Sequence, residues 1–251
     1  GFYTVADFES FDSKSRTWKL KEGVVDSSPL SDTPRPGNAK FKKLTPVDPN
    51  STNPYQLTEA DRTIIGNTTP KFSGGFGLNA TYKGFDMSMF FNFMYDFDVL
   101  NANKIMLTTW ADNKENNFLM DIASDKRWRN FDDMGNEIRY SPEVLAEFNK
   151  NATMWNPTSI GRPICMSYAV EDGSFLRLNS ATLGYTLPSV WTKKVGLSKV
   201  RFYVSGNNLF TLTGYSGYDP EVNIATGLTP NIDYNRYPRS RTYTFGAQLT
   251  F

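Results

Sequence analysis

The sequence has no histidine and a single cysteine, Cys165. Histidine is the commonest general base and metal ligand, so its absence removes Ser-His-Asp, Cys-His and histidine–zinc chemistry together. One cysteine can form neither an intrachain disulfide nor a cysteine-based zinc site. Catalysis is therefore not expected, and no cofactor or metal is predicted.

Long apolar runs and an excess of charge of either sign are also missing. No run of about 18 apolar residues occurs, which excludes a transmembrane helix. The negative mean hydropathy is still compatible with membrane-spanning strands, because such strands are apolar on only one face. The 27 Lys and Arg residues balance 26 Asp and Glu residues, so nucleic acid is not an expected partner.

What the sequence does have is a period-two pattern in residues 241–251. Successive strand side chains point to opposite faces, so large apolar residues fall on one face and Thr, Gly and Gln on the other. Transmembrane barrels divide their strands in this way, in segments of about ten residues. The pattern favours a barrel strand, and the final strand of a β-sandwich is the alternative. Its apolar members are Tyr243, Phe245, Ala247, Leu249 and Phe251.

A hairpin of two long strands is predicted in the first half of the chain. Apolar and small or polar residues alternate in 71–82 and 85–97, and Lys83–Gly84 has the composition of a tight turn. Strands of this length exceed the roughly 5 or 6 residues usual in soluble proteins and match strands that cross a membrane at a tilt. Further strands are expected at 175–187 and 199–210.

Short and long connections alternate between these strands. The Lys83–Gly84 turn and the link 188–198, with one helical turn capped by Gly196, are brief, whereas the inserts 98–173 and 211–240 are long. Transmembrane barrels have short periplasmic turns and longer extracellular loops, so the long inserts are predicted to be extracellular. Other expected elements are helices at Val99–Trp110 and Pro142–Lys150 and a short strand at Asn38–Leu44.

The segment 48–62 resembles a calcium-binding loop only in part. Asp48, Asn50 and Glu59 stand at ligand positions of an EF-hand-like loop, but Asn53 replaces the turn glycine and Thr52 an acidic ligand. A solvated turn is therefore the preferred interpretation over a metal site.

Five short segments follow one another in a recognisable order: Arg62–Gly75, Val170–Leu178, Val204–Phe210, Gly217–Val222, and Tyr237–Tyr243 leading to Phe251. Together they resemble the C-terminal part of SusC/RagA-type TonB-dependent outer-membrane transporters. The resemblance implies a barrel of roughly 22 strands with a plug domain in its lumen. It also implies partnership with the TonB complex and a SusD-like surface lipoprotein, and import of an oligosaccharide or peptide across the outer membrane of a Gram-negative bacterium.

The expected fold is therefore all-β. We predict an antiparallel transmembrane β-barrel, present here as roughly its last six strands with long extracellular loops. Residues 1–251 would form the C-terminal part of this barrel, without the plug and the N-terminal strands. The chain begins at Gly1 with neither an initiator Met nor a signal peptide, which fits a piece of a longer protein.

Two non-catalytic functions are compatible with these patterns. In the first, the chain is the barrel segment of an importer, and its apolar rows face outer-membrane lipid. In the second, it is a soluble all-β carbohydrate-binding module, and the same rows form a dry core. Aromatic residues in long loops are where sugars or peptides stack. The residues predicted to contact substrate or the lipoprotein are Trp128, Trp155, Tyr215 and Tyr218.

An enzyme is the third alternative. A retaining glycosidase needs paired carboxylates, and Asp132–Asp133 and Glu171–Asp172 are available. Adjacent carboxylates on a loop are usually only solvated, so no catalytic residue is predicted.

Overall fold

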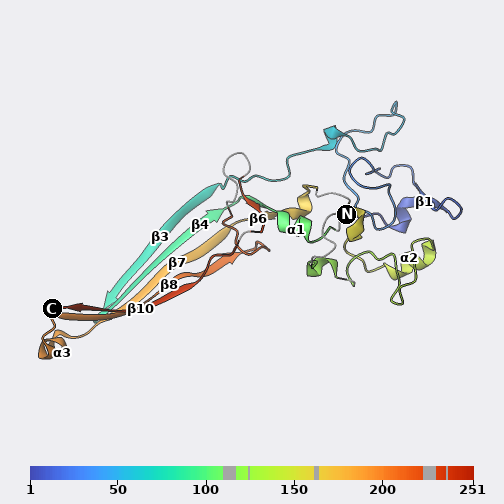
Figure 1. Cartoon of the computed structure of the whole chain (residues 1–251). Coiled ribbons are helices and arrows are strands. Elements are labelled where there is room, and N and C mark those ends of the chain that lie inside the picture. Colours follow the sequence, from blue (N-terminus) through green and yellow to red (C-terminus); the bar gives the residue numbers. More distant parts are fainter. Residues whose placement is uncertain (110–116, 124, 161–163, 223–229, 236) are drawn as a thin grey trace. The chain divides into compact units, whose positions relative to one another are not determined.

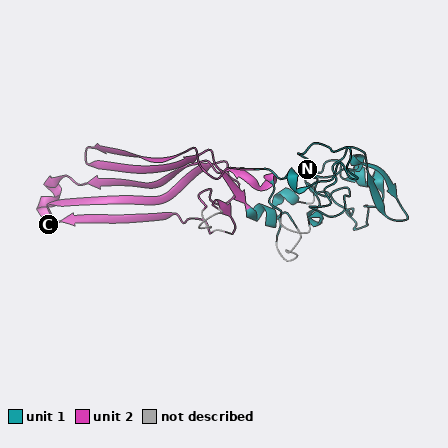
Figure 2. Cartoon of the chain, turned by 90° about the horizontal axis from the view of Figure 1, so that it is seen from above, with its two compact units in different colours: residues 1–64, 102–166 teal, residues 65–101, 167–251 magenta. Residues whose placement is uncertain are grey.

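The computed structural model describes residues 1–109, 117–123, 125–160, 164–222, 230–235 and 237–251 (Figure 1). The chain divides into two compact units (Figure 2). Unit 1 comprises residues 1–64 and 102–166, and unit 2 comprises residues 65–101 and 167–251.

Unit 2 is built on a five-stranded antiparallel sheet with the order β10-β8-β7-β4-β3 (Figure 1). Every strand pairs with its neighbour along the chain, apart from the short elements inserted between them, so the sheet is a meander. The strands predicted from alternation are confirmed. Their bounds are β3 Phe72–Tyr82, β4 Phe85–Tyr95, β7 Phe175–Thr186, β8 Lys199–Thr213 and β10 Thr242–Thr250.

The two predicted short connections join strands at one end of this sheet. Lys83 and Gly84 both have positive φ, 46° and 88°, as a type I′ hairpin turn requires. The pairing of β3 with β4 then runs without a shift from Tyr82–Phe85 to Phe72–Tyr95. The other connection holds α3 (Ser189–Thr192) and a 3₁₀ turn that Gly196 ends at φ 73°, as predicted.

One extra residue in β7 keeps its faces in phase. Before this residue the apolar positions of β7 are even-numbered, Leu176 and Leu178, and after it they are odd-numbered, Ala181 and Leu183. The apolar–polar alternation therefore shifts by one position within the strand. The pairing with both β4 and β8 skips from Leu178 to Ser180, which leaves Asn179 outside the register. This bulge returns the apolar residues to one face on both sides of the slip.

At its other end, unit 2 carries a small second sheet that the sequence did not predict. β5 (Asp98–Asn101) pairs antiparallel with β6 (Val170–Asp172) and parallel with β9 (Ile232–Asp233). These strands are two to four residues long and too short for a period to be visible. Beside them lies a core of buried residues: Phe97, Val99, Phe175, Tyr215 and Val222.

Unit 1 has little regular structure. It contains the hairpin β1 (Phe8–Asp12) and β2 (Thr17–Leu20) and the helices α1 (Ala102–Met106) and α2 (Pro142–Phe148). One cluster of its buried residues is formed by Trp128, Ile138 and Leu145, with Phe2, Val5, Trp18, Phe148 and Ala152 packed against them.

The local predictions in unit 1 have mixed outcomes. The predicted helix at Pro142 is confirmed, with Pro142 in the first turn, although it ends at Phe148. The helix predicted from Val99 begins only at Ala102, because Val99 lies in β5, and Trp110 lies outside the described residues.

The predicted strand Asn38–Leu44 is wrong. Only Ala39 makes a bridge, with Phe2. Side chains take up the backbone donors that a strand would use: Ser159 Oγ accepts from Ala39, Ser27 Oγ from Phe41, and Asp61 from Leu44. The side chains of Ser159, Ser27 and Asp61 thus satisfy backbone groups that sheet pairing would otherwise have to satisfy.

The remaining elements are 3₁₀ turns, and none of the helices in the described part of the chain is long and apolar enough to cross a membrane. The turns are Val5–Asp7, Glu59–Asp61, Met120–Ile122, Pro157–Ser159, Ser167–Ala169 and Lys193–Val195.

Candidate functional site

The five-stranded sheet has one apolar face, made of rows that run across all the strands. Antiparallel partners point to the same side, so the register fixes each row. Phe245 is 81% exposed and Leu249 50% exposed, so no second layer formed by the described residues covers this face. Two adjacent rows are Tyr82–Phe85–Tyr185–Phe202–Ala247 and Ala80–Met87–Leu183–Val204–Phe245.

The opposite face is lined mostly by small and polar residues, and its larger members include Phe90, Met94 and Tyr203. A representative row is Asn79–Ser88–Thr182–Ser205–Thr244. Arg201 donates to both carboxylate oxygens of Asp86 on this face, at 2.9 and 2.5 Å. Gly184 lies between the two strands that carry the pair, and a Cβ there would come within 2.6 Å of Asp86 Oδ1. Glycine therefore leaves the room that this bidentate pair occupies.

A four-residue ion network ties the segment after β8 to the sheet. Arg177 of β7 is 2% exposed and donates to Asp219 at 2.5 Å, and its other terminal nitrogen lies 3.4 Å from Glu221. Arg239, which precedes β10, contacts Glu221 at 3.0 Å and Asp219 at 3.8 Å. Two carboxylates thus bridge two guanidinium groups, an arrangement that suits the planar fork of arginine.

This network explains why several of the resembling segments occur together. Val170–Leu178 supplies Arg177, Gly217–Val222 supplies both carboxylates, and Tyr237–Tyr243 supplies Arg239. The segment Val204–Phe210 joins them, because the side chain of Asn208 donates to the Ser240 carbonyl.

The two predicted contact residues of unit 2, Tyr215 and Tyr218, differ in their burial. Tyr215 is buried, and its hydroxyl donates to Asp233 at 2.7 Å. Burial, and then the neighbouring Asp233 carboxylate, raise the pKa of the Tyr215 phenol. Tyr218 is 81% exposed. Of these two rings, only that of Tyr218 has free surface on which a ligand could stack.

The two predicted tryptophans lie inside unit 1. Trp128 is 3% exposed and packs against Phe2, and Trp155 is 5% exposed. Gly37 approaches the Trp128 indole so closely that a Cβ at this position would overlap the ring. Contact with a ligand stays a prediction for these residues, although in the free chain both rings belong to the packing of unit 1.

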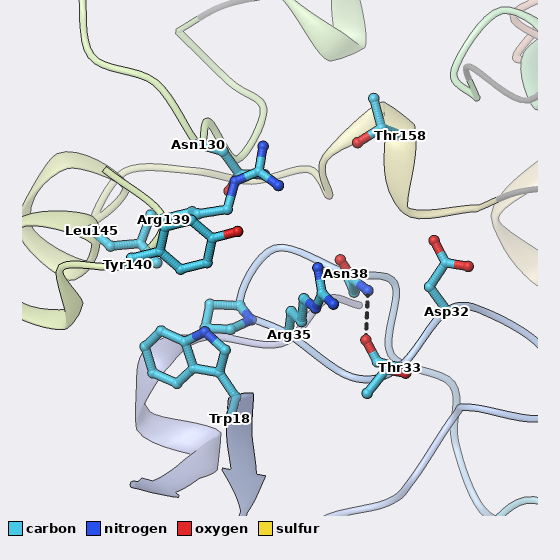
Figure 3. A pocket seen from close by; sticks show the side chains of 11 residues that line it. Trp18, Asp32, Thr33, Arg35, Asn38, Asn130, Arg139, Tyr140, Leu145 and Thr158 are labelled. Atoms are coloured by element: carbon cyan, nitrogen blue, oxygen red, sulfur yellow. Dashed lines mark hydrogen bonds between the residues drawn. The ribbon is translucent and has the colours of Figure 1, made fainter. Parts of the chain in front are cut away.

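Sequence reasoning missed a polar cavity of about 330 Å³ in unit 1 (Figure 3). We call it the arginine cavity and define it by Trp18, Arg35, Asn130, Arg139 and Tyr140, which lie on its wall. These residues come from two distant segments of the chain, 18–35 and 130–140, so no local sequence motif predicts the cavity. Asp32, Thr33, Asn38 and Thr158 also line it.

The candidate catalytic carboxylates are engaged in local structure. Asp132 accepts from the side chain and backbone of Asn136, which hold the pKa of Asp132 below its ordinary value, whereas a general acid needs a raised pKa. Asp133 pairs with Arg129 at 2.9 Å. Glu171 accepts from the backbone and hydroxyl of Ser216.

The partial calcium-loop pattern also forms a turn. The carboxylate of Asp48 accepts from the backbone of Asn50, two residues along the chain. Among the residues that the structure describes, no group of three or more acidic, His or Cys side chains could hold a metal ion.

Comparisons with known proteins identify relatives of one kind. No family model matches the chain. TonB-dependent receptor P3 of Formosa agariphila is 35% identical over 202 residues, which are 78% of this chain and 18% of that protein. TonB-dependent receptor P26 of the same organism is 28% identical over 94% of this chain and 22% of its own length. SusC of Bacteroides thetaiotaomicron is 38% identical over 34% of this chain and 8% of its own length.

The chain thus spans about a fifth of the length of the first curated relatives. Solved structures of the RagAB peptide importer share the fold. The "open-open" state gives a TM-score of 0.54 at 25% identity over 86% of this chain and 21% of that chain. The "closed-closed" state gives a TM-score of 0.50 at 23% identity over 98% of this chain and 22% of that chain.

The relatives are named as receptors and transporters, which fits the expectation of a non-enzyme. The two-faced antiparallel sheet has the construction of a barrel wall that is open in this chain. Sequence and structure together assign the chain to the SusC/RagA type of TonB-dependent receptors, as a segment of the transmembrane β-barrel.

Proposed function

We propose that residues 1–251 form part of the wall and extracellular loops of an importer in the outer membrane of a Gram-negative bacterium. The plug and the other barrel strands would come from the remainder of a longer protein. The observation that carries the proposal is the sheet whose one face is apolar and uncovered while its other face is polar. Lipid on one side and water on the other account for both faces.

A soluble carbohydrate-binding module is the second candidate, and it would need the apolar rows buried. Soluble monomers seldom expose contiguous apolar patches beyond a few hundred Å². Here Phe76, Leu78, Leu183, Phe202 and Leu249 keep about half of their surfaces exposed. The uncovered face therefore favours the importer.

The proposed partners follow from the relatives. The matched structures are those of a peptide importer, and one relative is SusC. We infer a SusD-like surface lipoprotein as lid, the TonB complex as the source of energy and an oligosaccharide or peptide as cargo. Tyr218 is the residue for which contact with cargo or lid is best supported, because its ring is exposed in a loop.

Membrane fractionation of the full-length parent tests this proposal. We expect the protein in the outer-membrane fraction, released only by detergent, with faster migration on electrophoresis when unheated, as folded barrels show. A parent that stayed monomeric and folded in buffer without detergent would support the soluble module. Uptake of labelled cargo by cells with and without TonB then tests transport.

A further inference from the structure

The arginine cavity of unit 1 combines cationic and aromatic groups with unused hydrogen-bonding capacity. Its volume of about 330 Å³ lies at the lower end of the roughly 300–1,000 Å³ typical of small-molecule pockets. Two arginines and one aspartate are its charged wall residues. The Trp18 ring packs against Phe8 and Phe11, at centroid distances of 5.3 and 4.8 Å.

Several polar ends in the cavity are available to a ligand. Within the described ranges, the guanidinium of Arg35, the side-chain amide of Asn130 and the hydroxyl of Tyr140 have no hydrogen-bond partner in the protein. Arg139 pairs with Glu137 through Nε at 2.5 Å, which leaves its two terminal nitrogens for another acceptor. In Figure 3 the Tyr140 hydroxyl and the Arg139 guanidinium both extend into the open space.

The Tyr140 ring is itself held in place by stacking. Phe11 packs nearly parallel to it with a centroid distance of 6.1 Å, and Arg16 lies over it at 4.8 Å. A fixed ring and a fixed indole lose little conformational entropy when a ligand binds, which favours affinity. The wall is therefore preorganised at its aromatic side.

We propose that the arginine cavity binds an acidic sugar unit, one that carries a carboxylate or a sulfate group, within a larger oligosaccharide. Arg35 and Arg139 present forked donors that match the oxygens of such an anion. The flat Trp18 indole suits the apolar face of a sugar ring. The side chains of Asn130 and Tyr140 can hydrogen-bond to hydroxyl groups of the sugar. The Asp32 carboxylate accepts from another sugar hydroxyl and repels the anionic group, and this pair of effects orients the sugar.

An acidic peptide is the competing occupant. Its side-chain carboxylates could use the arginines, and its backbone amides could pair with Asn130 and Tyr140, but its acidic side chains offer no flat apolar face to the Trp18 indole. An indole beside two arginines therefore favours a sugar ring that carries an anion over an acidic peptide. The inference rests on the proposed function and names the chemical class of the cargo.

Binding measurements on the detergent-purified full-length parent test the inference. The acidic probes are tetrasaccharides of galacturonate, of mannuronate and of sulfated galactose, the neutral probe is galactotetraose, and the peptide probe is tetraglutamate. We expect at least one acidic tetrasaccharide to bind about tenfold or more tightly than galactotetraose and tetraglutamate, with an affinity that falls as salt rises.

Variants locate the binding. Arg35→Ala and Arg139→Ala should each weaken the acidic tetrasaccharide by about tenfold, the loss expected for a charge-assisted contact, and Tyr140→Phe by a smaller factor. Lys42→Ala removes an exposed cation of the same unit outside the cavity and should leave the affinity unchanged.

Three results would overturn the inference: acidic and neutral tetrasaccharides that bind alike, Arg35→Ala and Arg139→Ala variants that keep full affinity, or tetraglutamate that binds as well as any acidic sugar. A parent that inserts into the outer membrane and imports a neutral or peptide cargo would leave the proposed function standing while the acidic-sugar inference fails. Failure of membrane insertion would instead remove the proposed function itself.

Discussion

At the scale of single residues, substitutions at two glycines of unit 1 distinguish the cost of backbone strain from the cost of side-chain overlap. Gly23 and Gly37 have similar left-handed φ values, +85° and +88°, but only at Gly37 would a Cβ overlap another side chain, the indole of Trp128. We expect Gly23→Ala to cost about 1–2 kcal/mol through strain alone. Gly37→Ala should cost a further 1–3 kcal/mol or so through overpacking.

Hydrogen exchange of the full-length parent measures this difference. The Trp128 amide, which donates to the Met154 carbonyl at 2.8 Å, reports on opening of the unit 1 core. Faster exchange at this amide in Gly37→Ala than in Gly23→Ala is the expected result. Equal exchange in both variants would show that the Trp128 ring is not held against Gly37.

Asp61 gives unit 1 a dependence on pH. Burial by itself raises the pKa of its carboxyl, but hydrogen bonds from Thr45, Thr58 and Leu44 outweigh it, so the pKa is lowered below the ordinary value of 3.8. A depressed folded-state pKa means that Asp61 stabilises the segment above its unfolded pKa. This stability is lost as the pH falls below about 4 toward the folded pKa.

Acid proteolysis of the full-length parent and of Asp61→Asn tests this dependence. The wild-type protein should lose protection of residues 41–62 against pepsin as the pH falls from 4 to 2. Asp61→Asn should cost about 1–3 kcal/mol at pH 5 and respond less to further acidification. Asp48→Asn, in an exposed turn, is the matched control and should behave like the wild-type protein.

At the scale of elements, the ion network holds the segment after β8 against the sheet. Arg177→Ala would leave the carboxylates of Asp219 and Glu221 without their buried cation, and breaking such a pair costs about 3–5 kcal/mol. Arg239 is more than a third exposed, so Arg239→Ala should cost only about 0–1 kcal/mol.

Exchange at the Glu221 amide, which donates to Asp219 at 2.9 Å, reports on release of this segment. We expect a large increase in Arg177→Ala and a small one in Arg239→Ala. Similar increases in the two variants would mean that the network does not depend on the buried guanidinium.

Neighbouring positions on β10 test which face meets lipid. Phe245 lies on the apolar face and Thr244 on the polar face of the same strand. An arginine on the lipid face costs about 2–4 kcal/mol at the membrane midplane and less near the interface, whereas a polar lumen accepts it. Phe245→Arg should therefore lower the amount of assembled parent in the outer membrane, and Thr244→Arg should not. Equal assembly of both variants would contradict the assignment of faces.

The elements that sequence could predict are those whose pattern repeats often enough to be seen. β3, β4 and β10 alternate over nine or more residues, so their faces follow from the order of the side chains. β9 has two residues and owes its existence to its parallel partner β5, a contact across more than a hundred positions. The segment Asn38–Leu44 was wrongly predicted as a strand, because several of its backbone N–H groups donate to the side chains of Ser159, Ser27 and Asp61 and not to a neighbouring strand.

The candidate site was harder to predict for the same reason. An aromatic residue in a loop looks the same in sequence whether it packs, as Trp128 does, or lies exposed, as Tyr218 does. The arginine cavity is assembled from side chains such as Trp18 and Arg139, which only the folding of unit 1 brings onto one wall. Long-range packing decides burial, and a single sequence carries little of that information.

At the scale of the whole molecule, the alternation of short and long connections predicts which end of the barrel faces outward. Lys83 is an exposed residue of the shortest turn, and Tyr218 is an exposed residue of a long connection. In a full-length parent with Cys165→Ser and no other cysteine, Tyr218→Cys should react with a membrane-impermeant maleimide on intact cells. Lys83→Cys should react only after the outer membrane is permeabilised, because short turns of such barrels face the periplasm.

The control for this labelling experiment is the same pair of variants after complete solubilisation in detergent, where both positions should react. Labelling of Lys83→Cys on intact cells, with protection of Tyr218→Cys, would reverse the orientation. The long connections could then not meet an extracellular lipoprotein or capture cargo from outside. Any transmembrane barrel could have such a two-faced sheet. Exposure of Tyr218 on the cell surface is therefore the observation that would connect this sheet with uptake from outside the cell.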